Sequence, residues 1–321
     1  MSKSHIKKGR VFMTFALSIG IIVSADGIRR NFFVKPDTTL IIAGNFKDSL
    51  NTASTQPGTN ISGLGTTQPT QNISYLGYSE FAVPASQLSS GILTVVNDLH
   101  PITDVFDASE AMINLSDIKN EFFSIRTEDL VLNEEAARAF NQMMLDYNSS
   151  TGLSNIVVYT TTQQYTGSDS LCSRYFPESS GGFTVDLAVQ GSYDTIEYDG
   201  RDTEAWIIEN CANYGFILRY PDGKDAVTGQ SKCPWHLRYV GKVHSLIMNA
   251  NNLSLEEYTE WIKSYTIDTA PYECDVDGMH YVIYYTPFMG DSTILRIPVS
   301  GNYTISGNNI DGFIVTAIKN Q

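Results

Sequence analysis

Residues 233–241 read Cys-Pro-Trp-His-Leu-Arg-Tyr-Val-Gly, the densest group of chemically distinctive side chains in the sequence. This string contains His236, one of five histidines in 321 residues. A second string, Pro-Glu-Ser-Ser-Gly-Gly-Phe-Thr-Val-Asp at residues 177–186, ends at Asp186. Histidine and aspartate both bind metals and carry protons in enzymes. The two strings are therefore the candidate functional site.

The segments around these strings alternate between helical and extended patterns. Asn133 and the acidic residues after it predict the N-terminus of a helix that ends near residue 151. Further helices are predicted at 203–214 and, after a capping box that begins at Ser254, at 254–262. Residues rich in β-branched side chains predict strands at 91–97, 155–162 and 184–189.

The pattern changes after Pro271. Three short apolar runs separated by turn residues predict strands at 280–285, 293–298 and 312–317. The fold class is therefore α+β, with a folded body over residues 91–265 and a small antiparallel β region over residues 266–321.

The N-terminal 90 residues have a different composition. Four basic residues precede an uncharged run of 15 residues, 11–25, which is too short to span a bilayer comfortably, since about 20 apolar residues are needed. Residues 1–25 therefore predict a secretory signal peptide or a short uncleaved membrane anchor, with the rest of the chain outside the cytoplasm. Residues 26–90 form an N-terminal extension, in which the Ser-, Thr-, Gly- and Pro-rich segment 51–74 predicts a linker.

Charge and composition exclude several classes of protein. The net charge of −14 opposes general binding to nucleic acid, which is a polyanion. The 18 tyrosines and 15 phenylalanines oppose a fully disordered chain. Any membrane contact is expected only through the N-terminal segment.

The two strings resemble the signatures of the VanY-like zinc D-alanyl-D-alanine carboxypeptidases, S-x-H-x-x-G-x-A-x-D followed by E-P-W-H. The resemblance covers roughly residues 90–265 and implies the zinc D,D-peptidase (hedgehog/DD-peptidase) fold. In that family the first His, the Asp and the last His hold zinc, and the Glu of the second signature is the general base. Asp186 and His236 match two of the zinc ligands, and Gly182 matches the glycine of the first signature.

This sequence departs from the family at three functional positions. Ser179 stands at the first zinc ligand and Cys233 at the general base, while the strand that should carry a carboxylate-binding Arg, residues 157–163, has none. A catalytic zinc needs three protein ligands and an open position for water, and serine is a poor ligand. We therefore expect zinc to be lost and no cofactor to replace it.

Cys233 has three alternative interpretations. Its thiolate is a possible replacement zinc ligand in a C-x-x-H spacing with His236, and it is also a possible nucleophile that uses His236 as base. The favoured interpretation is a buried thiol or half of a disulfide with Cys172 or Cys274, because exported cysteines commonly pair. Cys211 is the fourth cysteine.

Trp235, Arg238 and Tyr239 are the candidate binding residues of a retained groove, with roles in the core or in an ion pair as the alternative. His244 is expected on the surface of the helix that follows. The sequence therefore predicts an exported, catalytically inactive homologue that binds a peptidoglycan stem peptide or an envelope protein. The alternatives are an active metallo-carboxypeptidase with divergent ligands, which trims D-Ala from wall peptides, and a purely structural surface or assembly protein.

Overall fold

The computed structural model describes residues 77–102, 112–162 and 177–319. The predicted signal or anchor at 1–25, the linker at 51–74 and Cys172 lie outside these ranges, so the predictions about them stay predictions. Within the described ranges, no helix is both long enough and apolar enough to cross a membrane.

A mixed sheet forms the centre of the body, with its strands in the order β3–β5–β6–β9–β8 and with β7 paired to β6. All of its pairings are antiparallel except that of β3 with β5. The strands are β3 (Ser124–Ile125), β5 (Ile156–Thr160), β6 (Thr184–Gln190), β7 (Thr195–Glu197), β8 (Phe216–Leu218) and β9 (His236–Tyr239).

Helix α3 (Glu134–Thr151) covers one face of this sheet, and its ends are fixed by the sequence. The side chain of Asn133 accepts hydrogen bonds from the first turn, and Gly152 ends the helix in the left-handed conformation that glycine adopts without strain. Its apolar side, which includes Phe140 and Met143, packs against Val158 and other sheet residues in the main core.

Shorter elements complete the body and connect it to the C-terminal region. They are β2 (Met112–Asn114), α2 (Leu115–Ile118), β4 (Val131–Asn133), η4 (Pro177–Gly181), η5 (Asp202–Glu204), α4 (Ala205–Asn210), η6 (Cys211–Tyr214), α5 (Asp225–Thr228), α6 (Lys242–Asn251), α7 (Leu255–Trp261) and η7 (Ile262–Ser264).

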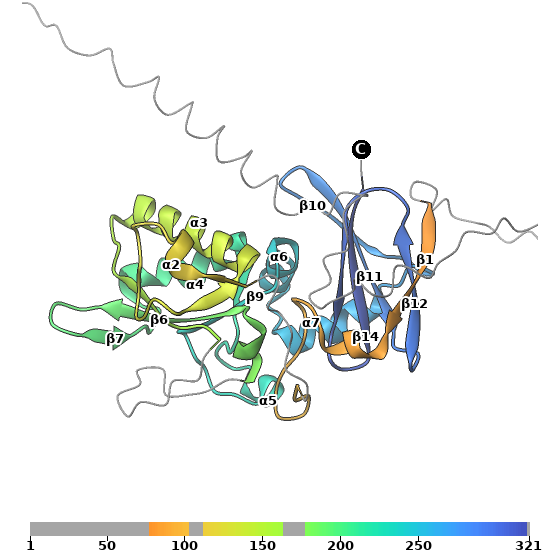
Figure 1. The fold of residues 1–321 in the computed structure, drawn as a ribbon, viewed down its shortest axis with the longest axis horizontal. Helices are drawn as coiled ribbons and strands as arrows, with labels where there is room; N and C mark the ends of the chain where they lie inside the picture. Colours follow the sequence, from red (N-terminus) through yellow and green to blue (C-terminus); the bar gives the residue numbers. More distant parts are fainter. Residues whose placement is uncertain (1–76, 103–111, 163–176, 320–321) are drawn as a thin grey trace, which may run out of the picture.

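The C-terminal β region contains an antiparallel sheet with the order β10–β11–β14–β13 and a separate two-stranded ribbon of β1 and β12. Strand β1, which precedes the body in sequence, thus lies in this region, and a short helix, η2 (Ala85–Ser89), follows it (Figure 1). Helices α6 and α7 pack on the sheet through a shared apolar cluster. The strands are β1 (Tyr78–Pro84), β10 (Tyr272–Val276), β11 (Met279–Pro287), β12 (Ser292–Pro298), β13 (Tyr303–Gly307) and β14 (Gly312–Lys319).

The α+β class and the antiparallel C-terminal sheet predicted from the sequence are confirmed. One predicted strand is wrong, because residues 91–97 are irregular. Their backbone makes hydrogen bonds to the C-terminal region and does not pair with a neighbouring strand. Leu93 N donates to Ser306 Oγ over 3.0 Å, and Val95 N donates to Asn308 O over 3.1 Å.

Candidate functional site

Strands β6 and β9 bring Asp186 and His236 directly opposite each other. The Asp186 Oδ1 and His236 Nδ1 atoms are 2.5 Å apart, and Thr160 on β5 donates to Asp186 Oδ2 over 2.7 Å. The pairing of β5 with β6 shifts register at Tyr159, a bulge that places Thr160 opposite Asp186. The two matched ligand positions are therefore neighbours in space.

Glu178, on the short helix η4, occupies the other side of the imidazole. Its Oε1 lies 3.2 Å from His236 Nε2 and accepts a 2.7 Å hydrogen bond from the hydroxyl of Tyr220. The ring of Tyr220 also stacks on the ring of His236, with centroids 5.5 Å apart. The Glu178 side chain is completely buried. Both ring nitrogens of His236 therefore face carboxylates.

Two buried arginines extend this cluster. Arg219 Nε donates to Glu178 Oε2 over 3.0 Å, and its two terminal nitrogens bind Glu256 on α7 over 2.9 and 2.7 Å. Arg238 Nη1 lies 3.5 Å from Glu178 Oε2. Bidentate arginine–carboxylate pairs are the most directional ion pairs in proteins. The cluster therefore connects the sheet of the body to α7, which packs on the C-terminal region.

The charges in this cluster balance when His236 is protonated. Among the described residues it then contains three anions, Asp186, Glu178 and Glu256, and three cations, Arg219, Arg238 and His236. Burial alone would lower the pKa of His236, but Asp186 and then Glu178 outweigh it and raise the pKa to about 9. Burial opposes ionisation of Glu178, but Arg219 and then His236 and Arg238 hold its pKa well below the usual range.

Glu178, Arg219, Tyr220 and Glu256 were not predicted from the sequence as site residues. A signal was available for Glu178, because it precedes Ser179 within the first string. For Glu256 there was none, since it reads as an acidic residue in the first turn of a helix.

Ser179 and Cys233 lie beside this cluster. Ser179 is buried, and its backbone carbonyl accepts a hydrogen bond from Gly182 N. Cys233 is also buried, and its Sγ donates to Ser231 O over 3.3 Å. Cys274 is a free thiol, so the Cys233–Cys274 disulfide offered as one alternative is not formed.

The three candidate binding residues have different surroundings. Trp235 is half-buried between the clusters of Tyr159 and Cys233, and its Nε1 has no hydrogen-bond partner among the described residues. Arg238 is buried in the ion-pair cluster, as in its alternative interpretation. Tyr239 projects from the opposite side of β9 to His236, because side chains alternate along a strand.

This geometry defines a class of protein: a mixed-sheet domain in which Asp and His face each other on adjacent strands, in the signature spacing of zinc D,D-peptidases. A family model described as VanY, D-alanyl-D-alanine carboxypeptidase, matches residues 178–242. A D-alanyl-D-alanine carboxypeptidase of Enterococcus faecium is 31% identical over 248 residues, which cover 74% of this chain and 78% of the relative. The chain therefore belongs to the D-alanyl-D-alanine carboxypeptidase family.

Two other relatives support the assignment. The bifunctional D-Ala-D-Ala dipeptidase and carboxypeptidase VanXYC of Enterococcus gallinarum is 41% identical over 85 residues, 25% of this chain and 45% of the relative. The crystal structure of the vancomycin resistance D,D-dipeptidase VanXYg with a D-Ala-D-Ala phosphinate analogue matches with a TM-score of 0.63 and 27% identity, covering 75% of this chain and 99% of that one. The predicted peptidase fold is thus confirmed.

The residues present do not fit the zinc of this family. Asp186 and Glu178 contact opposite nitrogens of the His236 ring and are not arranged around a common point. Among the described residues, no group of three or more His, Cys, Asp or Glu side chains is placed to hold a metal. A catalytic zinc also requires a third strong donor, and Ser179, which stands at that position, is a poor ligand.

Proposed function

We propose that this chain is an exported, catalytically inactive homologue of the D-alanyl-D-alanine carboxypeptidases that binds peptidoglycan stem peptides. The observation that carries the proposal is the pair of carboxylates on His236, at 2.5 Å from Nδ1 and 3.2 Å from Nε2. An imidazole that donates from both nitrogens has no lone pair left for a metal. Ion pairs within the chain thus occupy the His236 nitrogens that would otherwise bind a metal.

The general base is also missing from this arrangement. Cys233 stands at the base position, and its thiol points to the Ser231 carbonyl. A cysteine nucleophile needs a neighbouring base that accepts its proton. A protonated His236, whose pKa is raised by Asp186 and Glu178 against the effect of burial, does not accept one. This supports an inactive protein over a cysteine enzyme as well as over a metallo-peptidase.

Export rests on the charge pattern of residues 1–25. Peptide binding rests on family membership together with the signature residues present in strings 177–186 and 233–241. The second candidate role is binding to an envelope protein. The β region beyond residue 266 adds surface to the peptidase-like body, and this surface favours such a role.

The test measures binding and turnover on the same purified protein. A peptide that ends in D-Ala-D-Ala is titrated into the chain by calorimetry, with the amidated peptide as control, and released D-Ala is measured in parallel with added Zn²⁺. Saturable binding of the free-acid peptide without D-Ala release supports the proposal. Release of D-Ala contradicts it, and absence of binding leaves the envelope-scaffold role as the better account.

A further inference from the structure

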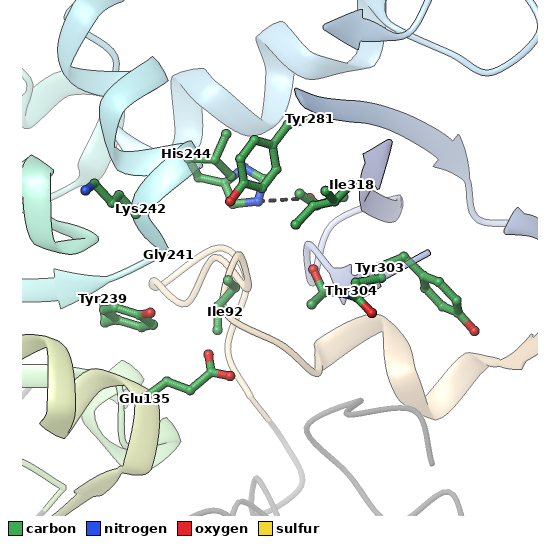
Figure 2. A pocket seen from close by; sticks show the side chains of 13 residues that line it. Ile92, Glu135, Tyr239, Gly241, Lys242, His244, Tyr281, Tyr303, Thr304 and Ile318 are labelled. Carbon is green, nitrogen blue, oxygen red and sulfur yellow. Dashed lines mark hydrogen bonds between the residues drawn. The ribbon is translucent and has the colours of Figure 1, made fainter. Parts of the chain in front are cut away.

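A hollow lies between the peptidase-like body and the C-terminal β region, on the other side of β9 from His236 (Figure 2). Its cavity volume is about 50 Å³, enough for a few small groups, and it is partly open to solvent. Its walls come from the start of α3, the turn between β9 and α6, strands β11 and β14, and the segment that leads into β13. These elements belong to parts of the chain that are far apart in sequence.

Three oxygen-bearing side chains converge on this hollow. Figure 2 shows the Glu135 carboxylate and the hydroxyls of Tyr239 and Tyr281 pointing into it from three elements. None of the three side chains has a hydrogen-bond partner among the described residues. Tyr239 is only 1% exposed, so its hydroxyl reaches solvent space only through the hollow. Buried polar groups normally have partners, and a set without them indicates a site for a missing one.

The electrostatics agree with this geometry. Burial and then the neighbouring Glu134 raise the pKa of Glu135 to about 7. Burial, and after it the charges of Glu135 and Tyr281, raise the pKa of Tyr239 well above its usual value. Glu135 and Tyr281 therefore both act on Tyr239, and no positive group raises or lowers the pKa of Glu135 among the causes of its shift.

The cation and the imidazole in the lining are engaged elsewhere. Lys242 donates to Asp277 over 2.7 Å, and Figure 2 shows its ammonium directed away from the hollow. His244 lies between Tyr258 and Thr316, at 2.7 and 3.0 Å. The remaining lining includes apolar side chains such as Ile92. The hollow is thus an acceptor site with an apolar wall.

We propose that this hollow binds a primary ammonium group carried on a slim aliphatic stem. An ammonium has three donors, which matches one carboxylate and two phenolic oxygens. Ile92 in the lining offers an apolar contact for the stem. A divalent metal is disfavoured, because hard cations need six or more oxygens and usually several charges. This inference is independent of the function proposed above.

The experiment titrates n-butylammonium into the full ¹⁵N-labelled chain at pH 8 and follows backbone amide shifts by NMR. We expect saturable shifts at residues around Glu135, Gly241 and Tyr281, with millimolar affinity. The matched neutral ligand is n-butanol, which should bind at least tenfold more weakly. Nα-acetyl-lysine methylamide, with the norleucine analogue as control, distinguishes a lysine side chain from a free amine as the source of the ammonium.

Variants locate the site. Glu135→Gln should weaken butylammonium binding at least tenfold and Tyr281→Phe two- to threefold. Glu134→Gln, which alters a half-exposed carboxylate paired with Arg138, should change it less than twofold. Thermal melts confirm that each variant is folded. Equal binding of butylammonium and butanol, or full binding by a folded Glu135→Gln, would overturn the proposal. So would the absence of saturable shifts in the wild-type chain.

Discussion

Glu178→Gln is the substitution that most directly probes the buried ion-pair cluster. The glutamine keeps the shape of the side chain but removes a charge that contacts Arg219 at 3.0 Å, His236 at 3.2 Å and Arg238 at 3.5 Å. Two anions, Asp186 and Glu256, then remain for three buried cations. The new amide also turns a donor toward groups that themselves donate, Tyr220 among them.

Removal of one partner from a buried ion pair costs about 3–5 kcal/mol, because the other charge stays buried without compensation. We expect a loss in this range in the free energy of unfolding, measured by urea denaturation at pH 7. For a folded region of this size, that loss lowers the melting temperature by roughly 10 °C.

Glu134→Gln is the matched control. Its carboxylate pairs with Arg138 one turn along α3, with both side chains about half exposed, and such helix pairs contribute about 0.3–0.5 kcal/mol. A loss for Glu178→Gln that is no larger than that of the control would refute the inference that His236 and the arginines depend on this carboxylate.

Three further results are expected. Ser179→His with Cys233→Glu supplies the missing ligand and base, so that zinc held by three strong ligands can displace the proton of His236. This variant should raise zinc affinity at least 100-fold over wild type in a competition titration; no gain would mean that the signatures are wrongly placed. Burial lowers the pKa of His244 to about 3. The folded protein therefore loses stability as the pH falls from about 6.5, the pKa in the unfolded chain, toward 3. Urea unfolding across this window should show a loss of up to about 4 kcal/mol in the free energy of unfolding, and His244→Gln should reduce that loss. Burial and Glu134 raise the pKa of Glu135 to about 7. The free energy of unfolding should therefore fall by about 1–2 kcal/mol as the pH rises from 4.5 through 7. The same fall in a Glu135→Gln variant would contradict the assignment of this pH dependence to Glu135.

The Glu135 prediction depends on the groups that face this carboxylate. They are Glu134 on its own helix, Tyr239 from β9 and Tyr281 from β11, while Lys242 on α6 is bound to Asp277. The nearest groups are thus neutral or negative, and none of them lowers the pKa of Glu135.

Local patterns predicted much of the fold. The Asn133 cap and the Ser254 capping box mark real helix starts, and the C-terminal runs that end near 285, 298 and 317 are real strands. Such signals are read within a few residues, so sequence alone is sufficient. The strand predicted at residues 91–97 was wrong for the opposite reason. Their apolar side chains are buried, but their backbone makes hydrogen bonds to distant residues such as Ser306 and Asn308.

The candidate site was predictable in part. The strings predicted that Asp186 and His236 belong to one site, and the structure places them opposite each other on β6 and β9. Glu178 lies within the first string, but its pairing with His236 and Arg219, and that of Arg219 with Glu256, depend on contacts across 37 to 58 residues of sequence, which no local pattern encodes. His244 was expected on a helix surface, but it is buried, because α6 is covered on that side by α7 and β14.

Zinc binding by the wild-type chain shows whether His236 holds a metal or only its two carboxylate partners. The purified protein is stripped with chelator, titrated with Zn²⁺ by calorimetry and compared with His236→Gln. Both nitrogens of the His236 ring are held by carboxylates. We therefore expect the wild-type chain and His236→Gln to give the same zinc titration. One equivalent of tightly bound zinc that disappears in His236→Gln would contradict it.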